Sequence, residues 1–141
     1  MRTYAELDEV PLSAVEPEGW LRQYLVNQRH GLTGHLDECG FPFNTPGWGA
    51  KHVRYRGGDV WWPYEQVGYW VDGMVRCGHL LRDRGLLRKA RRQIEYALRH
   101  ADRDGYLGPP FLKRGLRWPH AVFFRALMAE HSASGDPRIP R

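Results

Sequence analysis

One helical pattern in the middle of the chain constrains the fold more than any other feature. From Val67 onward, apolar residues recur three or four positions apart, which is the spacing of one face of an α-helix. This face consists of Val67, Trp70, Val71, Met74, Val75, Gly78 and Leu81. Pro63 stands just before it, where the first turn of a helix accepts a proline. The sequence therefore predicts a helix here with one buried side.

Three other segments have helical patterns. Residues 18–30 carry aromatic and aliphatic side chains on one face. Residues 87–101 are apolar on one side and basic over most of the rest, so we predict a helix with one side in water. Residues 121–128 are apolar around most of the helical circumference, which predicts a helix covered on several sides, and Pro119 would start it.

The interval between the first two predicted helices is expected to be a long irregular loop. Residues 35–62 contain five glycines and two prolines and have no sustained period. Gly31 and Gly34 favour an end to the first helix just before this interval. Loops of this length inside compact domains are usually functional or mobile.

The composition is that of one ordinary globular domain. The 141 residues are 42% hydrophobic and 26% charged, so we expect a single domain over residues 1–141. No apolar run reaches the roughly 18 residues of a membrane span, and the first ten residues are acidic, unlike a secretory signal. We therefore expect a soluble, cytoplasmic protein without a membrane partner.

The order of the helices predicts an all-α fold built in layers. Helices with one apolar face precede a helix that is apolar nearly all round, as in a toroid of antiparallel helix pairs with inner and outer layers. We therefore predict part of an (α/α) barrel. Four helices do not close such a ring, so this would be the N-terminal part of a longer barrel. Apolar surfaces left uncovered in such an arc would favour self-association.

A polar stripe on the central helix is the main candidate for function. Its residues are Glu65, Tyr69, Asp72, Arg76 and His79, all on the side opposite the apolar face. One interpretation is a solvated face with Asp72 and Arg76 paired one turn apart. The other is a sugar subsite, because Trp61 and Trp62 immediately precede the stripe and aromatic rings suit sugar faces.

A hydrolytic carboxylate pair and a metal site have little support in the sequence. Glu65 and Asp72 would have backbones roughly 10 Å apart, at the upper end of the range for an inverting hydrolytic pair. His35, Asp37, Glu38 and Cys39 cluster without any spaced metal motif. We therefore assign no catalytic residue and expect no metal or cofactor within this chain.

The basic residues suggest nucleic-acid binding as an alternative function. The net charge of +5 is concentrated around residues 82–103, and such a helix could follow a phosphate backbone. The solvated outer helix of a toroid would have the same composition. We expect the solvated outer helix and no nucleic-acid partner.

Five short motifs occur in an order that resembles one enzyme family. They are GWLRQ at 19–23, GLTGHLDE at 31–38, YWVDGM at 69–74, DGYLGP at 104–109 and RWPH at 117–120. Together they resemble the β-L-arabinofuranosidase-like glycoside hydrolases, family 127 and its relatives, formerly a domain of unknown function. The resemblance spans residues 11–137 and only the early part of that family's catalytic domain. WWPYEQ at 61–66 departs from it, since many relatives have a shorter, more charged tract there.

The resemblance implies an (α/α) barrel whose central cavity binds a furanose sugar. It also implies a zinc-held cysteine nucleophile in later helices, beyond this part of the domain, and Cys39 and Cys77 match no such motif. Zinc is thus possible only in a full-length relative. With the aromatic pair, the predicted carbohydrate-binding residues are His35, Asp37, Trp61, Trp62, Glu65, Tyr69 and Asp72.

The expected function follows from this resemblance. The chain would be the N-terminal portion of a glycoside hydrolase acting on arabinofuranoside-like or related glycosides, lining the pocket without supplying the nucleophile. The alternative is a non-catalytic carbohydrate-binding or scaffold helical module.

Overall fold

The computed structural model describes residues 9–45, 48 and 61–139, and these residues form helices and turns without a strand. The all-α prediction is therefore confirmed for this part of the chain. The α-helices are α1 (Gly19–His30), α2 (Leu32–His35), α3 (Trp62–Leu80), α4 (Arg84–Arg99) and α5 (Trp118–Ser134). Short 3-10 helices are η1 (Leu12–Ala14), η2 (Leu36–Cys39) and η3 (Pro110–Arg114). None of the described helices is long and apolar enough to cross a membrane.

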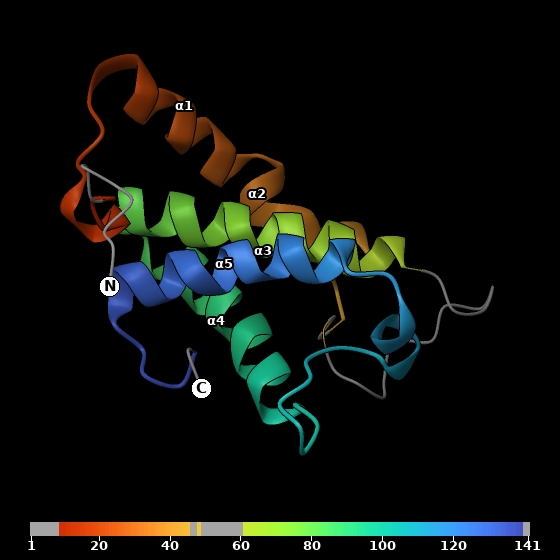
Figure 1. Ribbon diagram of the computed structural model, residues 1–141. Coiled ribbons are helices and arrows are strands. Elements are labelled where there is room, and N and C mark those ends of the chain that lie inside the picture. The colour runs from red at the N-terminus through yellow and green to blue at the C-terminus, as the bar shows by residue number, and fades with distance from the viewer. Residues whose placement is uncertain (1–8, 46–47, 49–60, 140–141) are drawn as a thin grey trace.

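Helices α3 and α5 lie side by side and run in the same direction (Figure 1). Three pairs of polar side chains join them at successive positions, so that the partners advance together along both helices. These pairs are Glu65 with Trp118, Asp72 with Arg125, and His79 with Glu130. A parallel pair needs a connection that returns to the starting end, and α4 with the segment after it provides this return.

Helix α1 packs on another side of α3 and runs in the opposite direction. The Cys77 thiol donates to the Leu25 carbonyl at 3.4 Å, and Trp70 Nε1 donates to the Thr33 carbonyl at 2.9 Å. Moving forward along α1 and α2, the contacts therefore move backward along α3. Figure 1 shows α4 passing behind α3 and α5, so that α3 has neighbours on three sides.

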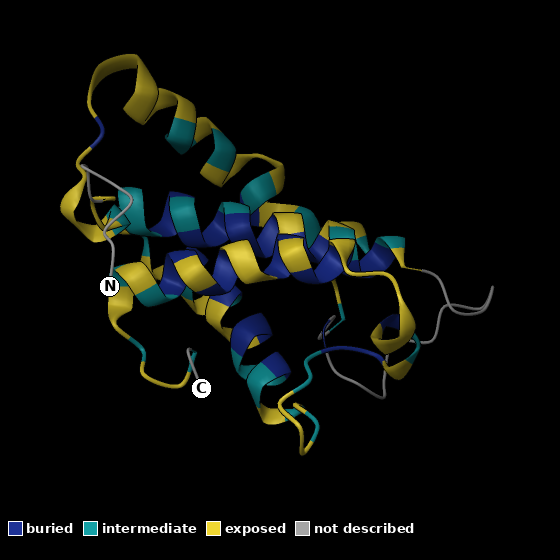
Figure 2. Ribbon diagram, in the orientation of Figure 1, coloured by how far each residue is buried: buried dark blue, intermediate teal, exposed yellow. Residues whose placement is uncertain are grey.

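The core follows the predicted apolar face of α3. Val67, Val71, Met74 and Val75 are fully buried, and Figure 2 shows buried ribbon where α3 and α5 face each other. The core also takes in side chains of the two following helices and one from outside them. These are Ala90, Ile94 and Ala97 of α4, Phe123, Ala126 and Leu127 of α5, and Trp48. The helix predicted from periodicity alone is therefore the central element of the fold.

Two glycines of α3, Gly68 and Gly73, differ in how closely a neighbouring element packs against them. A Cβ at Gly68 would lie 3.0 Å from Val122 Cγ1 and 3.3 Å from the Phe123 nitrogen. Helix α5 therefore packs against the backbone of α3 at this position. Gly73 differs, since a Cβ there would lie 3.7 Å from Thr33 Cγ2, at ordinary contact distance.

Helices α4 and α5 differ from their predicted bounds. Helix α4 begins three residues earlier than predicted, because Asp83 Oδ1 accepts from the backbone nitrogens of Gly85 and Leu86 at 2.8 and 2.9 Å and caps the helix. Helix α5 continues beyond the predicted Met128 to Ser134. It ends at Gly135, whose φ of 69° is in the left-handed region that favours glycine.

The prediction of an irregular loop over residues 35–62 is wrong for residues 35–39. Helical structure continues through α2 and η2 to Cys39, because residues 32–39 include only one glycine and no proline. That glycine, Gly34, lies within α2 instead of ending α1. A Cβ there would lie only 1.9 Å from the Arg29 carbonyl oxygen, so the sharp bend after α1 requires glycine. Much of the remaining loop lies outside the described residues.

The prediction that the helix over residues 121–128 is covered on several sides is also wrong, because one side of α5 is exposed among the described residues. Phe124 is 46% exposed, Met128 is 64% exposed, and Trp118 in the first turn is 53% exposed. The buried part of the helix meets α3, η1 and Trp48. One side of α5 is therefore an uncovered apolar stripe.

Candidate functional site

The predicted polar stripe of α3 lies along its contact with α5, and we call this strip the α3–α5 seam. It comprises Glu65, Tyr69, Asp72 and Arg76 from α3 with Trp118 and Arg125 from α5. At one end of the seam, Trp118 Nε1 donates to Glu65 Oε1 at 2.5 Å, in the first turns of the two helices. Trp118 and Tyr69 are both exposed, so this end presents a carboxylate between accessible aromatic rings.

Asp72 occupies the middle of the seam and is buried, unlike a residue on a solvated face. Arg76 Nε donates to its Oδ1 at 2.7 Å, which confirms the predicted pair one turn apart. Arg125 of α5 reaches its Oδ2 at 3.1 Å. A buried carboxylate needs such partners, because an uncompensated charge is costly away from water. Asp72 thus joins the two helices, with both carboxylate oxygens engaged by arginines.

The far end of the seam has a buried carboxylate with two basic partners. Glu130 of α5 accepts from His79 of α3 at 2.9 Å and from Arg91 of α4 at 2.7 Å. Burial raises the pKa of this carboxyl, and the two hydrogen bonds outweigh that effect, so its pKa lies below the ordinary value. The cluster joins three helices at one point.

Trp61 and Trp62 lie at the start of α3, next to Glu65 in the sequence. Trp61 is exposed, and Trp62 is half-buried with its ring edge-on to Phe41 at 6.0 Å between centroids. The two tryptophans that precede the polar stripe therefore lie at the same end of α3 as the Glu65–Trp118 hydrogen bond.

His35 and Asp37 do not join the seam. His35 Nδ1 lies 2.7 Å from Glu38 Oε1 at an exposed position. Asp37 Oδ1 accepts from Lys89 Nζ of α4 at 2.8 Å. The structure therefore divides the seven predicted residues into five at α3 and two on the side where α2, η2 and α4 meet.

Asp37 lines a pocket of about 450 Å³ beside α4. This volume falls within the range of small-ligand sites. The other lining residues are Phe43, Asn44, Thr45, Trp70, Lys89, Arg92, Gln93 and Tyr96. Gln93 is buried, and its Oε1 has no hydrogen-bond partner among the described residues.

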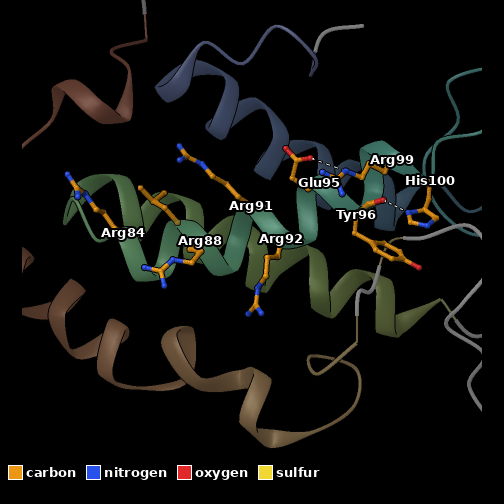
Figure 3. Close-up of a pocket in the computed structure, with 9 residues that line it drawn as sticks. Arg84, Arg88, Arg91, Arg92, Glu95, Tyr96, Arg99 and His100 are labelled. Carbon is orange, nitrogen blue, oxygen red and sulfur yellow. Dashed lines mark hydrogen bonds and ion pairs between the residues drawn. The ribbon is translucent and has the colours of Figure 1, made fainter.

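A second hollow follows the basic side of α4 (Figure 3). Arg84, Arg88 and Arg92 line it and have no carboxylate partner among the described residues, whereas Arg91 pairs with Glu130 and Arg99 with Glu95. At its far end, the Tyr96 and His100 rings stack with centroids 4.0 Å apart. The surface is open, as expected for a solvated helix face.

No grouping of three or more His, Cys, Asp or Glu side chains suited to a metal occurs within residues 9–45, 48 and 61–139. No protein-family model, curated protein or solved structure matches this chain.

Sequence reasoning missed the α5 half of the seam. Trp118 lies within the RWPH motif, and Arg125 is the one charged residue of the segment 121–128, which was predicted to be covered on several sides. A lone cation in an apolar helix is a signal that it meets a buried acid elsewhere. Neither the parallel register nor the partner, Asp72, follows from the sequence spacing alone.

Proposed function

We propose that this chain is the N-terminal portion of a glycoside hydrolase acting on arabinofuranoside-like glycosides, and that the α3–α5 seam contributes to sugar binding. The observation that carries the proposal is the Glu65–Trp118 hydrogen bond with Tyr69 nearby on α3. Exposed aromatic rings offer apolar faces to sugar C–H groups, and the carboxylate accepts from sugar hydroxyls.

The helix arrangement supports the barrel component of this proposal. In an (α/α) barrel, inner helices are parallel neighbours, and outer helices return the chain between them. Helices α3 and α5 are parallel, and α4 lies between them in sequence with its basic side in water. The seam would then lie on the inner wall, where such barrels bind their substrates.

A binding titration tests the proposal. Arabinofuranose oligosaccharides are titrated while tryptophan fluorescence is followed, and the same titration is run on Trp118→Ala and Glu65→Gln. We expect saturable quenching that each substitution weakens at least tenfold. Trp20→Ala is the matched control, because Trp20 is 81% exposed on α1. Unchanged fluorescence, or equal loss in all three variants, would remove the basis for a sugar site at the seam.

A non-catalytic carbohydrate-binding module is the second candidate, and the state of the seam carboxylates favours it. Asp72 is held by two arginines, and Glu65 by an indole. Hydrolysis needs an acid and a base or nucleophile that are free to exchange protons. The chain is therefore expected to release no product from aryl arabinofuranosides, with or without zinc. Turnover that depends on Glu65 would exclude this second candidate.

A further inference from the structure

Helix α1 holds two aromatic side chains in water. Trp20 is 81% exposed, and Tyr24, four positions later, is 54% exposed. None of the α1 residues is buried, and Figure 2 shows this helix exposed along most of its length at one edge of the molecule. Residues four positions apart on a helix have Cβ atoms about 5–6 Å apart, so the two side chains are neighbours. Both therefore keep apolar surface that is open to a partner.

Two amide side chains lie on the same stripe of α1. Trp20, Gln23, Tyr24 and Asn27 occupy the i, i+3, i+4 and i+7 positions of one helical face, and all four are exposed. We call these four residues the α1 face. Gln23 Nε2 donates to Asn27 Oδ1 at 3.0 Å, which orders the two amides. The bond leaves Gln23 Oε1 as an acceptor and Asn27 Nδ2 as a donor, and reversing both amides would still leave one of each.

The two arginines of α1 lie away from this face. Arg29 pairs with Asp83, the residue that caps α4, on the side toward the rest of the fold. Arg22 comes seven positions before Arg29, about two helical turns, and shares that side, whereas Trp20 is about two and a half turns away and lies opposite. A surface helix ordinarily turns its charges to water and its apolar residues inward. Helix α1 has the reverse arrangement, with an exposed face that carries no acidic or basic side chain.

A sugar chain matches the chemistry of the α1 face better than other partners. Aromatic rings pack against sugar C–H groups, and sugar hydroxyls both donate and accept, as the two ordered amides require. An apolar protein segment would cover the amides without pairing them, which is costly. A charged polymer would find no opposite charge on this face. Because a helix surface is convex, it covers little of a single sugar, so several linked units are needed to use the whole face.

We propose that the α1 face binds an uncharged polysaccharide of β-1,4-linked pyranoses along the side of its chain. Such chains are extended and present C–H groups on the faces of successive sugar units. These faces lie against the Trp20 and Tyr24 rings, and neighbouring hydroxyls pair with Gln23 and Asn27. The site shares no residue with the α3–α5 seam and does not depend on the function proposed there.

The test uses calorimetric titrations of the intact chain with three hexasaccharides: cellohexaose, mannohexaose and xylohexaose. We expect at least one of them to bind, and its monosaccharide to bind at least tenfold more weakly, because one unit cannot reach both rings and both amides. If none of the hexasaccharides binds, the proposal is wrong. A monosaccharide that binds as tightly as its hexasaccharide would show a closed pocket elsewhere and would also overturn it.

Substitutions at exposed positions locate the site without disturbing the core. Trp20→Ala and Tyr24→Ala should each weaken hexasaccharide binding at least tenfold. Leu32→Ala is the matched control, since Leu32 is 67% exposed on α2, outside the α1 face, and its loss should change binding less than twofold. Trp118→Ala, in the seam, should have equally little effect. An equal loss in Leu32→Ala would indicate general apolar adhesion, and an equal loss in Trp118→Ala would place the sugar at the seam. Either result would overturn the proposal.

Sedimentation velocity separates a sugar site from a contact between two copies of the chain. Trp20→Ala should self-associate to the same extent as the native sequence, because the α1 face is proposed to meet sugar and not protein. Loss of self-association in this variant would show that a second copy occupies the α1 face, contrary to the proposal.

Discussion

The indole nitrogen of Trp118 donates to the Glu65 carboxylate at 2.5 Å and ties the first turn of α5 to the first turn of α3. The two residues are 53 positions apart in the sequence. The polar groups at this end of the seam are therefore ordered by the protein itself. A sugar would meet a carboxylate whose direction is already set, which lowers the entropy cost of binding.

The Glu65–Trp118 bond should be measurable as a coupling energy. Hydrogen bonds to charged groups contribute about 1.5–3 kcal/mol, and partial exposure lowers this. A double-mutant cycle of Glu65→Gln and Trp118→Phe, followed by urea denaturation, should therefore give a coupling of about 1 kcal/mol. Pairing Glu65→Gln with Trp20→Phe should give none. Additivity in both cycles would mean that the bond does not persist in solution.

Two glycines of α3 should respond in opposite directions to alanine. Gly68→Ala places a methyl group against Val122 and the α5 backbone, so we expect a loss of about 1–3 kcal/mol in unfolding free energy. Gly73→Ala has room and should gain up to about 1 kcal/mol from helix propensity. Thermal denaturation of both variants checks the pair. Stabilisation by both substitutions would contradict the close packing of α3 on α5.

Glu130→Gln should be strongly destabilising. It leaves the buried His79 and the half-exposed Arg91 without their shared carboxylate, and losing hydrogen bonds to a charged group costs about 1.5–3 kcal/mol. The matched control is Glu16→Gln, because the exposed Glu16–Arg82 pair should contribute less than about 1 kcal/mol. Guanidinium denaturation of the two variants compares them. A similar small loss in both would show that the buried cluster contributes little.

Stability should fall as the pH is lowered through the histidine range. Burial lowers the pKa of His120 from its ordinary 6.5, an effect that the Leu107 carbonyl opposes and Arg117 reinforces. The unfolded chain then binds the proton more readily than the folded chain, so stability is lost as pH falls from about 6.5 toward the folded pKa. Urea midpoints between pH 7.5 and 5.5 measure this.

The pH effect should be traceable to one side chain. His120→Gln should flatten the dependence in this range, while His30→Gln, at an exposed position, should leave it unchanged. If the slope persists in the first variant, the histidine responsible lies elsewhere.

The uncovered stripe of α5 should promote self-association. Phe124 and Met128 are exposed apolar side chains one turn apart, and such patches drive contact between molecules. We expect sedimentation velocity to show concentration-dependent association. The double substitution Phe124→Glu and Met128→Lys, which adds no net charge, should reduce it. Leu32→Lys removes an exposed leucine from α2 and serves as the comparison. A monomer at all concentrations would refute this prediction.

The sequence was most informative where one helix supplied the pattern. The buried face from Val67 to Val75 and the Asp72–Arg76 pair follow from spacing within α3, and both are present in the structure. Local periodicity determines which side of a helix is apolar. Trp70 was also correctly placed in the core, where its Nε1 reaches the Thr33 carbonyl.

The sequence was least informative where distant segments meet. Trp48 is fully buried, stacks on Phe123 at 4.5 Å and donates to the Tyr64 carbonyl, yet it falls in a stretch predicted to be an irregular loop. Arg125 was not linked to Asp72, and Asp37 was grouped with residues on the other side of α3. Such pairings depend on helix order and direction in space, which periodicity does not contain.

The shared direction of α3 and α5 has an electrostatic consequence. Their amino ends lie at one end of the molecule, so the partial positive charges of two macrodipoles are brought together and repel each other. Glu65 lies in the first turn of α3 and touches the first turn of α5, and its negative charge offsets both. Neutralising this one carboxylate would thus unmask a positive potential produced by two helix backbones together, without any basic side chain being added.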